Sequence, residues 1–240
     1  MSPARTLAVA RRELGGYFGS PIAYVVLAAT AAYSAAAFLP GFASGRPASL
    51  RSLCGDVAWI AILVAPALSM RLISEELRSG TFERLAASPV RSGELVLGKW
   101  AAAWVCYAGV LIGPIAAAVA LEGHANPEWG PMLAGMLAIL LAGGLYLAAG
   151  TFASALSRNQ VIALLLAVFA VGAPTLALHA LADASWLGGP TRRLLARLSV
   201  ADQLAELQRG VLDLRTPLFF VTTTAMFLFW ATLAVEGRRR

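Results

Sequence analysis

Long apolar runs separated by short charged segments dominate the sequence. Six runs stand out, and five of them hold at least 20 residues without Asp, Glu, Lys or Arg. A helix rises 1.5 Å per residue, so a hydrocarbon core about 30 Å thick needs about 20 residues. The pattern therefore predicts six membrane-spanning helices, the second of which needs extension at both ends. The runs are residues 21–42, 57–70, 100–121, 129–157, 159–182 and 216–235.

Residues 3–18 form the first of three amphipathic segments. Leu7 and Phe18 fall on one face of a helix, with Arg5 and Arg12 on the opposite face. A helix with one apolar face and one charged face lies in the membrane interface rather than across the bilayer. The sequence therefore predicts an interfacial helix before the first span.

Residues 71–99 and 183–215 contain the other two amphipathic segments. The first mixes charges with Leu, Ile and Phe and is interrupted by Gly80 and Pro89, which predicts two short cytoplasmic helices joined by a turn. The second is a loop on the outer side of the membrane. Its apolar residues recur at helical spacing over residues 191–210, so we expect one helix against the outer leaflet.

The composition supports a membrane protein and excludes most other classes. Hydrophobic residues make up 59% of the chain and charged residues 13%, against about 45–50% and about 25% in soluble domains. Two cysteines are too few for a disulfide scaffold. The net charge of +6 falls in short segments between apolar runs, which favours membrane topology over nucleic-acid binding. Residues 1–240 are therefore expected to form one all-α, polytopic transmembrane domain.

The distribution of basic residues predicts the orientation of the chain. With the N-terminus inside, 12 of the 19 Lys and Arg residues lie in inner segments and 7 in outer segments. Six acidic residues fall inside and seven outside, so the inner face carries the whole positive excess. Because cytoplasmic loops are enriched in Lys and Arg, we expect both termini in the cytoplasm.

The sequence contains no recognisable catalytic constellation. The predicted spans carry acidic or basic residues only at their ends, whereas an intramembrane enzyme or an ion-coupled carrier keeps such groups at membrane depth. His179 and Asp183 lie one turn apart, and a structural hydrogen bond is favoured over a proton or metal site because two residues do not fill a coordination shell. Cys54 is predicted outside and Cys106 within a span, which argues against a disulfide.

Residues 93–99 have the glycine and lysine spacing of a nucleotide-binding P-loop. Trp100, however, stands where a Ser or Thr must bind magnesium, and no strand precedes the segment. The residues between Gly93 and Gly98 are bulky, whereas a phosphate cradle needs exposed backbone amides. We therefore predict that this chain does not hydrolyse ATP.

The inner segment between the second and third predicted spans is much longer than a chain reversal requires. Residues 70–90, which we call the hook, mix both charge signs with apolar residues. Composition alone leaves two interpretations open. The hook is either a folded segment that docks into another protein or a solvated, positive-inside hairpin.

The hook resembles the membrane subunits of type-2 ABC transporters, most closely the gliding-motility and nitrous-oxide-maturation branch. That family carries Met-Arg, a Glu pair, Arg-Ser-Gly-Thr, a further Glu, a Leu and Ser/Thr-Pro-Val before Gly-Lys. Leu77 replaces the usual Arg after the Glu pair, and residues 210–215 resemble the family's outer-loop motif. The matching residues are Met70–Arg71, Glu75–Glu76, Arg78–Ser79–Gly80–Thr81, Glu83, Leu85, Ser88–Pro89–Val90 and Gly98–Lys99.

This resemblance implies a permease subunit of an ATP-driven transporter, an exporter, in the bacterial plasma membrane. Two such subunits, identical or different, would pair on two copies of an ABC ATPase subunit. The ATPase would hold ATP and magnesium, so this chain would need no cofactor and would bind no nucleic acid. ATP-driven closure would push the hook and tilt the first, second and fifth spans. A non-transporting scaffold and a membrane-embedded enzyme are the alternatives.

The resemblance also implies a set of contacts to the ATPase. Carboxylates of the hook would meet basic groups of the ATPase, and Gly80 and Pro89 would set the bends. Each residue could instead be an ordinary helix-surface residue. The expected set is Glu75, Glu76 and Glu83 as charged contacts, Arg78 and Thr81 as contacts or caps, and Ser79, Gly80, Leu85 and Pro89.

Overall fold

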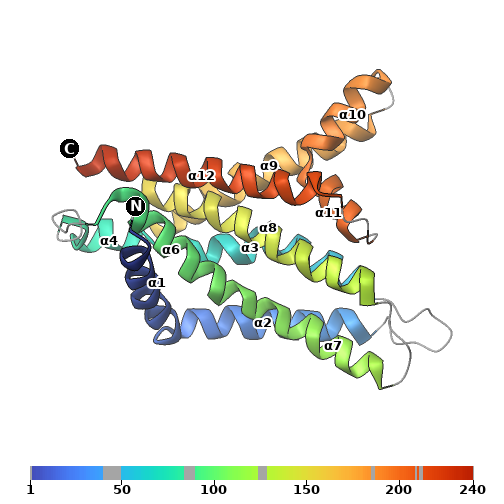
Figure 1. Ribbon diagram of the computed structural model, residues 1–240, viewed down its shortest axis with the longest axis horizontal. Coiled ribbons are helices and arrows are strands. Elements are labelled where there is room, and N and C mark those ends of the chain that lie inside the picture. The colour runs from blue at the N-terminus through green and yellow to red at the C-terminus, as the bar shows by residue number, and fades with distance from the viewer. Residues whose placement is uncertain are drawn as a thin grey trace.

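The computed structural model describes residues 2–39, 50–83, 90–123, 129–184, 187–208, 210 and 213–239. Over these residues the chain is helical, without strands, and six helices are long and apolar enough to cross a membrane. The predicted all-α, six-span fold is therefore confirmed (Figure 1). The spans are α2 (Pro21–Phe38), α3 (Arg51–Ser69), α6 (Ser92–Tyr107) continued by η2 (Ala108–Leu111) and α7 (Ile112–Glu122), α8 (Trp129–Leu156), α9 (Gln160–Asp183) and α12 (Arg215–Arg239).

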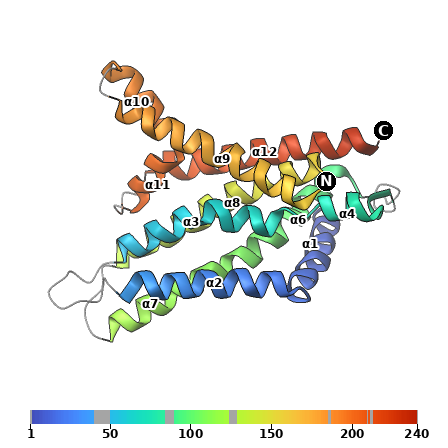
Figure 2. The same cartoon turned by 180° about the vertical axis from the view of Figure 1, so that it is seen from behind.

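Among the described residues, four shorter helices lie at the two ends of this bundle. The beginning of α1, the helix α4 and the end of α12 share one end, while α10 and α11 lie at the other (Figures 1 and 2). α1 crosses its end of the bundle and has the bounds predicted for the amphipathic N-terminal helix. The short helices are α1 (Pro3–Phe18), α4 (Ser74–Ser79), α10 (Gly189–Leu198) and α11 (Val200–Gln208).

The amphipathic segment predicted for the outer side of the membrane forms two helices, so the prediction of one helix over residues 191–210 is wrong. The break lies at Ser199, whose backbone is extended (φ −78°, ψ 120°). The Ser199 hydroxyl accepts a hydrogen bond from the amide of Asp202 at 3.3 Å. A serine at this position caps the following helix by satisfying one of its unpaired amides. Local capping therefore outweighs the continuous apolar spacing.

The third span is also interrupted, by the 3₁₀ turn η2. Pro114 lies in the first turn of α7. A proline has no backbone amide, and its ring clashes with the carbonyl four residues earlier, which here belongs to Val110 in η2. The tighter turn fits this constraint and keeps the span continuous enough to cross the membrane.

The central helix of the bundle is α8. In the most apolar stretch of α8, 72% of the residues are buried within the chain, compared with 17% in the corresponding stretch of α2. Glycines on α8 allow close approach: a Cβ atom on Gly143 would lie 1.9 Å from the ring of Tyr107, and one on Gly135 would lie 2.8 Å from the Cβ of Cys54. Because lipid provides no hydrophobic drive between helices, such close packing of small residues is a main source of association.

We expect Gly143→Ala to destabilise the protein, because the buried ring of Tyr107 occupies the space of the new methyl group. Gly130→Ala is the matched control, because Gly130 lies on the same helix and a Cβ atom there meets nothing within 4 Å. Overpacking costs about 1–3 kcal/mol. Thermal unfolding in detergent should show a lower Tm for Gly143→Ala than for Gly130→Ala. Equal Tm values would contradict the packing described for α8.

Candidate functional site

The hook begins with a turn and the one-and-a-half-turn helix α4. Glu75 and Glu76 lie in the first turn of α4, where negative charge opposes the positive end of the helix dipole. α4 ends at Gly80, whose φ of 71° is a left-handed conformation that glycine adopts without strain. The hydroxyls of Ser79 and Thr81 lie 2.9 Å apart, one on each side of this glycine. The local sequence thus defines both the helix and its abrupt end.

Three charged side chains lie on the surface of the described part of the hook. Glu75, Arg78 and Glu83 are exposed, with no ion pair between them and the other described residues. Leu85 and Pro89, which belong to the expected ATPase-contacting set, lie outside the described residues. The described part of the hook therefore offers both signs of charge to a partner.

The turn before α4 is fixed to the central helix by Ser154 of α8. The Ser154 hydroxyl accepts hydrogen bonds from the amides of Ile73 and Ser74, at 3.0 and 2.9 Å, and donates one to the carbonyl of Met70 at 2.9 Å. Amides at the start of a helix have no partner within the helix, so the Ser154 hydroxyl takes the place of the side-chain cap that α4 lacks. Ser154 is fully buried. The start of the hook is therefore attached to the core of the bundle.

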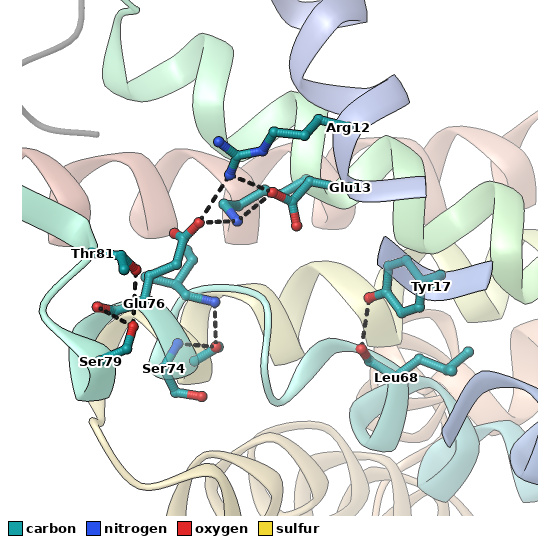
Figure 3. Close-up of polar contacts among 11 residues, drawn as sticks. Arg12, Glu13, Tyr17, Leu68, Ser74, Glu76, Ser79 and Thr81 are labelled. Atoms are coloured by element: carbon teal, nitrogen blue, oxygen red, sulfur yellow. Dashed lines mark hydrogen bonds and ion pairs between the residues drawn. The ribbon is translucent and has the colours of Figure 1, made fainter. Parts of the chain in front are cut away.

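A charged cluster connects α4 with α1 and α6. Lys99 of α6 is 1% exposed, and its Nζ atom lies 2.8 Å from Oε1 of Glu76 and 3.0 Å from Oε1 of Glu13. Arg12 of α1 lies 2.9 Å from Glu13 and 3.3 Å from Glu76 (Figure 3). We call these four residues the Lys99 junction. Two cations and two carboxylates neutralise one another where three helices meet.

The two carboxylates of the Lys99 junction are satisfied to different degrees. Burial alone would raise the pKa of Glu13, but Lys99 and Arg12 outweigh burial and lower that pKa, so Glu13 is charged at neutral pH. Glu76 binds both cations through Oε1, while its Oε2 atom is buried and has no partner among the described residues. Glu76, which the sequence predicts to contact the ATPase, has partners within the chain.

α1 and α6 are packed as a pair. A Cβ atom on Gly98 of α6 would lie 2.8 Å from the Cβ of Val9 on α1, so only a glycine permits this approach. Glu94, in the first turn of α6, accepts hydrogen bonds from the amides of Ser2 and Arg91. These contacts attach the beginning of α1 to the beginning of α6.

The other end of α1 contacts the end of α3 and the connection from α3 to α4. The Tyr17 hydroxyl donates a hydrogen bond to the carbonyl of Leu68 at 2.7 Å. The guanidinium of Arg71 lies 5.3 Å from the centre of the Tyr17 ring and donates a hydrogen bond to the Ser20 hydroxyl at 2.7 Å. A pocket of about 240 Å³ opens here, lined by Glu13, Gly16, Tyr17, Ser20, Arg71, Leu72 and Glu75.

The candidate polar pair at the other end of the bundle involves His179. His179 pairs through Nδ1 with Asp202 of α11 at 3.1 Å, and the side chain of Asp183 lies outside the described part of the chain. In the described residues no group of three or more His, Cys, Asp or Glu could hold a metal ion. Cys54 and Cys106 are both buried and free.

Comparison with known families supplies one independent finding. A family model described as ABC-2 family transporter protein matches residues 18–182, more than half of the chain. The matched part includes the hook and Lys99, whereas Arg12 and Glu13 precede it. No curated protein matches the sequence.

We expect Lys99→Met to destabilise the protein by about 3–5 kcal/mol, because Glu13 and Glu76 would lose a buried cation. Lys99→Arg keeps the charge and should cost less. Thermal unfolding at neutral pH measures both. The difference in stability between Lys99→Met and the parent should narrow as the pH falls below 4.5, the ordinary pKa of Glu. Protonation of Glu13 at low pH abolishes its ion pair with Lys99 in the parent. Equal stability of Lys99→Met and the parent at neutral pH would contradict this account.

Gly80→Ala should loosen the hook without affecting the spans. The left-handed conformation costs a residue other than glycine about 1–2 kcal/mol, and no neighbouring atom blocks the new methyl group. Trypsin should therefore cleave the hook several-fold faster in this variant, while the Tm of the spans stays unchanged. Gly237→Ala, at an equally open position with ordinary φ, is the control. Identical cleavage rates would argue against a conformational role for Gly80.

Proposed function

The chain belongs to the ABC-2 transporter family, and on this premise we propose that it is the permease subunit on which a separate ABC ATPase acts through the hook. The observation that carries the proposal is the arrangement of α4. The outer side of the hook presents Glu75 and Arg78 of α4 and Glu83 beyond its end, while α4 is attached to the bundle through Ser154 and Glu76. A segment built in this way can receive a force at its surface and pass it to the spans.

The buried side chains of the hook favour a folded docking segment over a solvated hairpin. Leu72, Ile73 and Phe82 are at most 6% exposed. A loop that only reverses the chain gains nothing from a fixed apolar face, whereas a docking segment needs one to hold its shape. The two charge signs on the outer side suit a protein surface better than an anionic membrane surface.

We place the end of the bundle that carries the hook in the cytoplasm of a bacterial plasma membrane. α4, the beginning of α1 and the end of α12 lie together at this end (Figure 1). The excess of Lys and Arg in the same segments supports the orientation. ATP and the ATPase would then meet the hook on the same side of the membrane.

ATP and magnesium would belong to the partner. The segment with P-loop spacing is part of helix α6, and its Lys99 is buried and paired with two carboxylates, which supports the assignment of ATP hydrolysis to another subunit. By the family pattern, two permease subunits, identical or different, would pair on two ATPase subunits. The hook motif supports the gliding-motility and nitrous-oxide-maturation branch, and with it export as the direction of transport.

The experiment that tests the proposal is purification of the tagged chain from its native membranes in mild detergent. We expect a stoichiometric polypeptide that hydrolyses ATP to co-purify. The double change Glu75→Lys and Glu83→Lys should reduce its recovery several-fold, because like charges facing each other across an interface cost several kcal/mol.

Glu236→Lys is the control for this double change, since Glu236 is exposed near the end of α12 and lies outside the hook. It should leave recovery of the ATPase unchanged. Full recovery with the hook variant would contradict docking at this surface. The absence of any ATPase from the parent preparation would favour a non-transporting scaffold.

A further inference from the structure

The helix α4 is held at two points that lead to different parts of the bundle. At its start, the buried hydroxyl of Ser154 binds the backbone of the turn and fixes it to α8. Two residues after Ser74, Glu76 binds Lys99 of α6 and Arg12 of α1. In the described part of the chain, the polar contacts from α4 to α1 and α6 all pass through Glu76. Figure 3 shows both attachment points.

The two helices that Glu76 contacts, α1 and α6, are packed closely against each other. Val9 packs against Gly98 so closely that a Cβ atom there would not fit, and Glu94 binds the amide of Ser2. Lys99 then joins α1 to α6 a second time through Glu13. A displacement delivered to Lys99 therefore moves both helices together.

We propose that the Lys99 junction is the point at which movement of the hook passes to α1 and α6, with Ser154 as the pivot. This inference rests on the proposed function, since the ATPase supplies the movement. Lys99 is a positioning residue in this scheme: it is buried and touches neither the ATPase nor the cargo. Because α1 leads into α2 and α6 is itself a span, the path runs to the first and third spans directly.

The chemistry of the Lys99 junction suits this role. Hydrogen bonds between ionised groups are stronger than neutral ones and gain further strength away from water. Separation of Glu76 from Lys99 would leave the buried ammonium with Glu13 as its one carboxylate partner in the Lys99 junction, so a shift of the three helices together costs less than rupture. Glu76 also has a second carboxylate oxygen without a partner among the described residues, so it can exchange oxygens on Lys99 while α4 turns.

The test uses the complex of this chain with its ATPase subunit in lipid nanodiscs. Spin labels are placed on Ala8→Cys in α1 and Arg158→Cys after α8, two exposed positions. The distance between the labels is measured with and without ATP plus vanadate. We expect a nucleotide-dependent change in the parent complex and in Lys99→Arg, and its loss in Glu76→Gln. The ATPase should remain bound in all three.

Glu76→Gln is the informative variant because it keeps the pair of Lys99 with Glu13 and removes a charge only from the hook. Glu236→Gln, an exposed carboxylate on α12, is the matched control and should keep the distance change. A lower Tm with an intact distance change in Glu76→Gln would mean that the pair is merely structural, and would overturn the proposal.

Other outcomes separate this inference from the function on which it rests. Loss of the ATPase from Glu76→Gln, with the protein still folded, would make the Lys99 junction part of the docking surface and overturn its role as a transmission point. Failure of the parent chain to co-purify with any ATPase would overturn the proposed function itself. Additive effects of Glu76→Gln and Lys99→Met on the distance change would also contradict the inference, because residues that act as one contact are non-additive.

Discussion

A single buried ammonium determines how the parts of this protein are connected. Lys99 is 1% exposed and lies within 3.0 Å of carboxylates from two other helices. A buried charge is tolerated only with partners, so the position of Lys99 requires Glu13 on α1 and Glu76 on α4 to stay beside it. The helix α1, the described part of the hook and the third span are therefore held in one arrangement by electrostatics. The spans themselves are held differently, by close contact of small residues on α8 with α3 and α6.

Close packing of small residues and contacts between charged groups occur in different parts of the molecule. Within the spans, the packing of Gly135 and Gly143 against their neighbours needs no water and no charge. At the end of the bundle that carries the hook, backbone amides and charged side chains need partners, and Ser154 and Lys99 supply them. The described part of the hook is thus attached to the bundle on its inner side and charged on its outer side. A partner that binds the outer side acts on a folded lever, whose movement is constrained at both attachment points.

The sequence predicts the fold well because membrane insertion depends on local composition. Each span needs about 20 apolar residues, and that requirement can be counted along the chain. The bounds of α1 are also correct, since its apolar and basic faces alternate with helical period. The break at Ser199 and the 3₁₀ turn before Pro114 were not predicted, because they depend on one hydroxyl cap and one missing amide within otherwise continuous patterns. Apolar periodicity carries no information about either.

The candidate site is less accessible to sequence reasoning, because its contacts join residues that are far apart in the chain. The motif indicated Glu76 and Lys99, but nothing local shows that they meet, that Arg12 and Glu13 complete the group, or that Ser154 holds the start of α4.

The most direct measurement of the central claim is a pair of cryo-electron microscopy structures of the complex with its ATPase, without nucleotide and with ATP plus vanadate. The account predicts that α4, α1 and α6 shift together while Lys99 stays bonded to Glu76. A shift of α4 with the ion pair broken and α1 and α6 unmoved would contradict it.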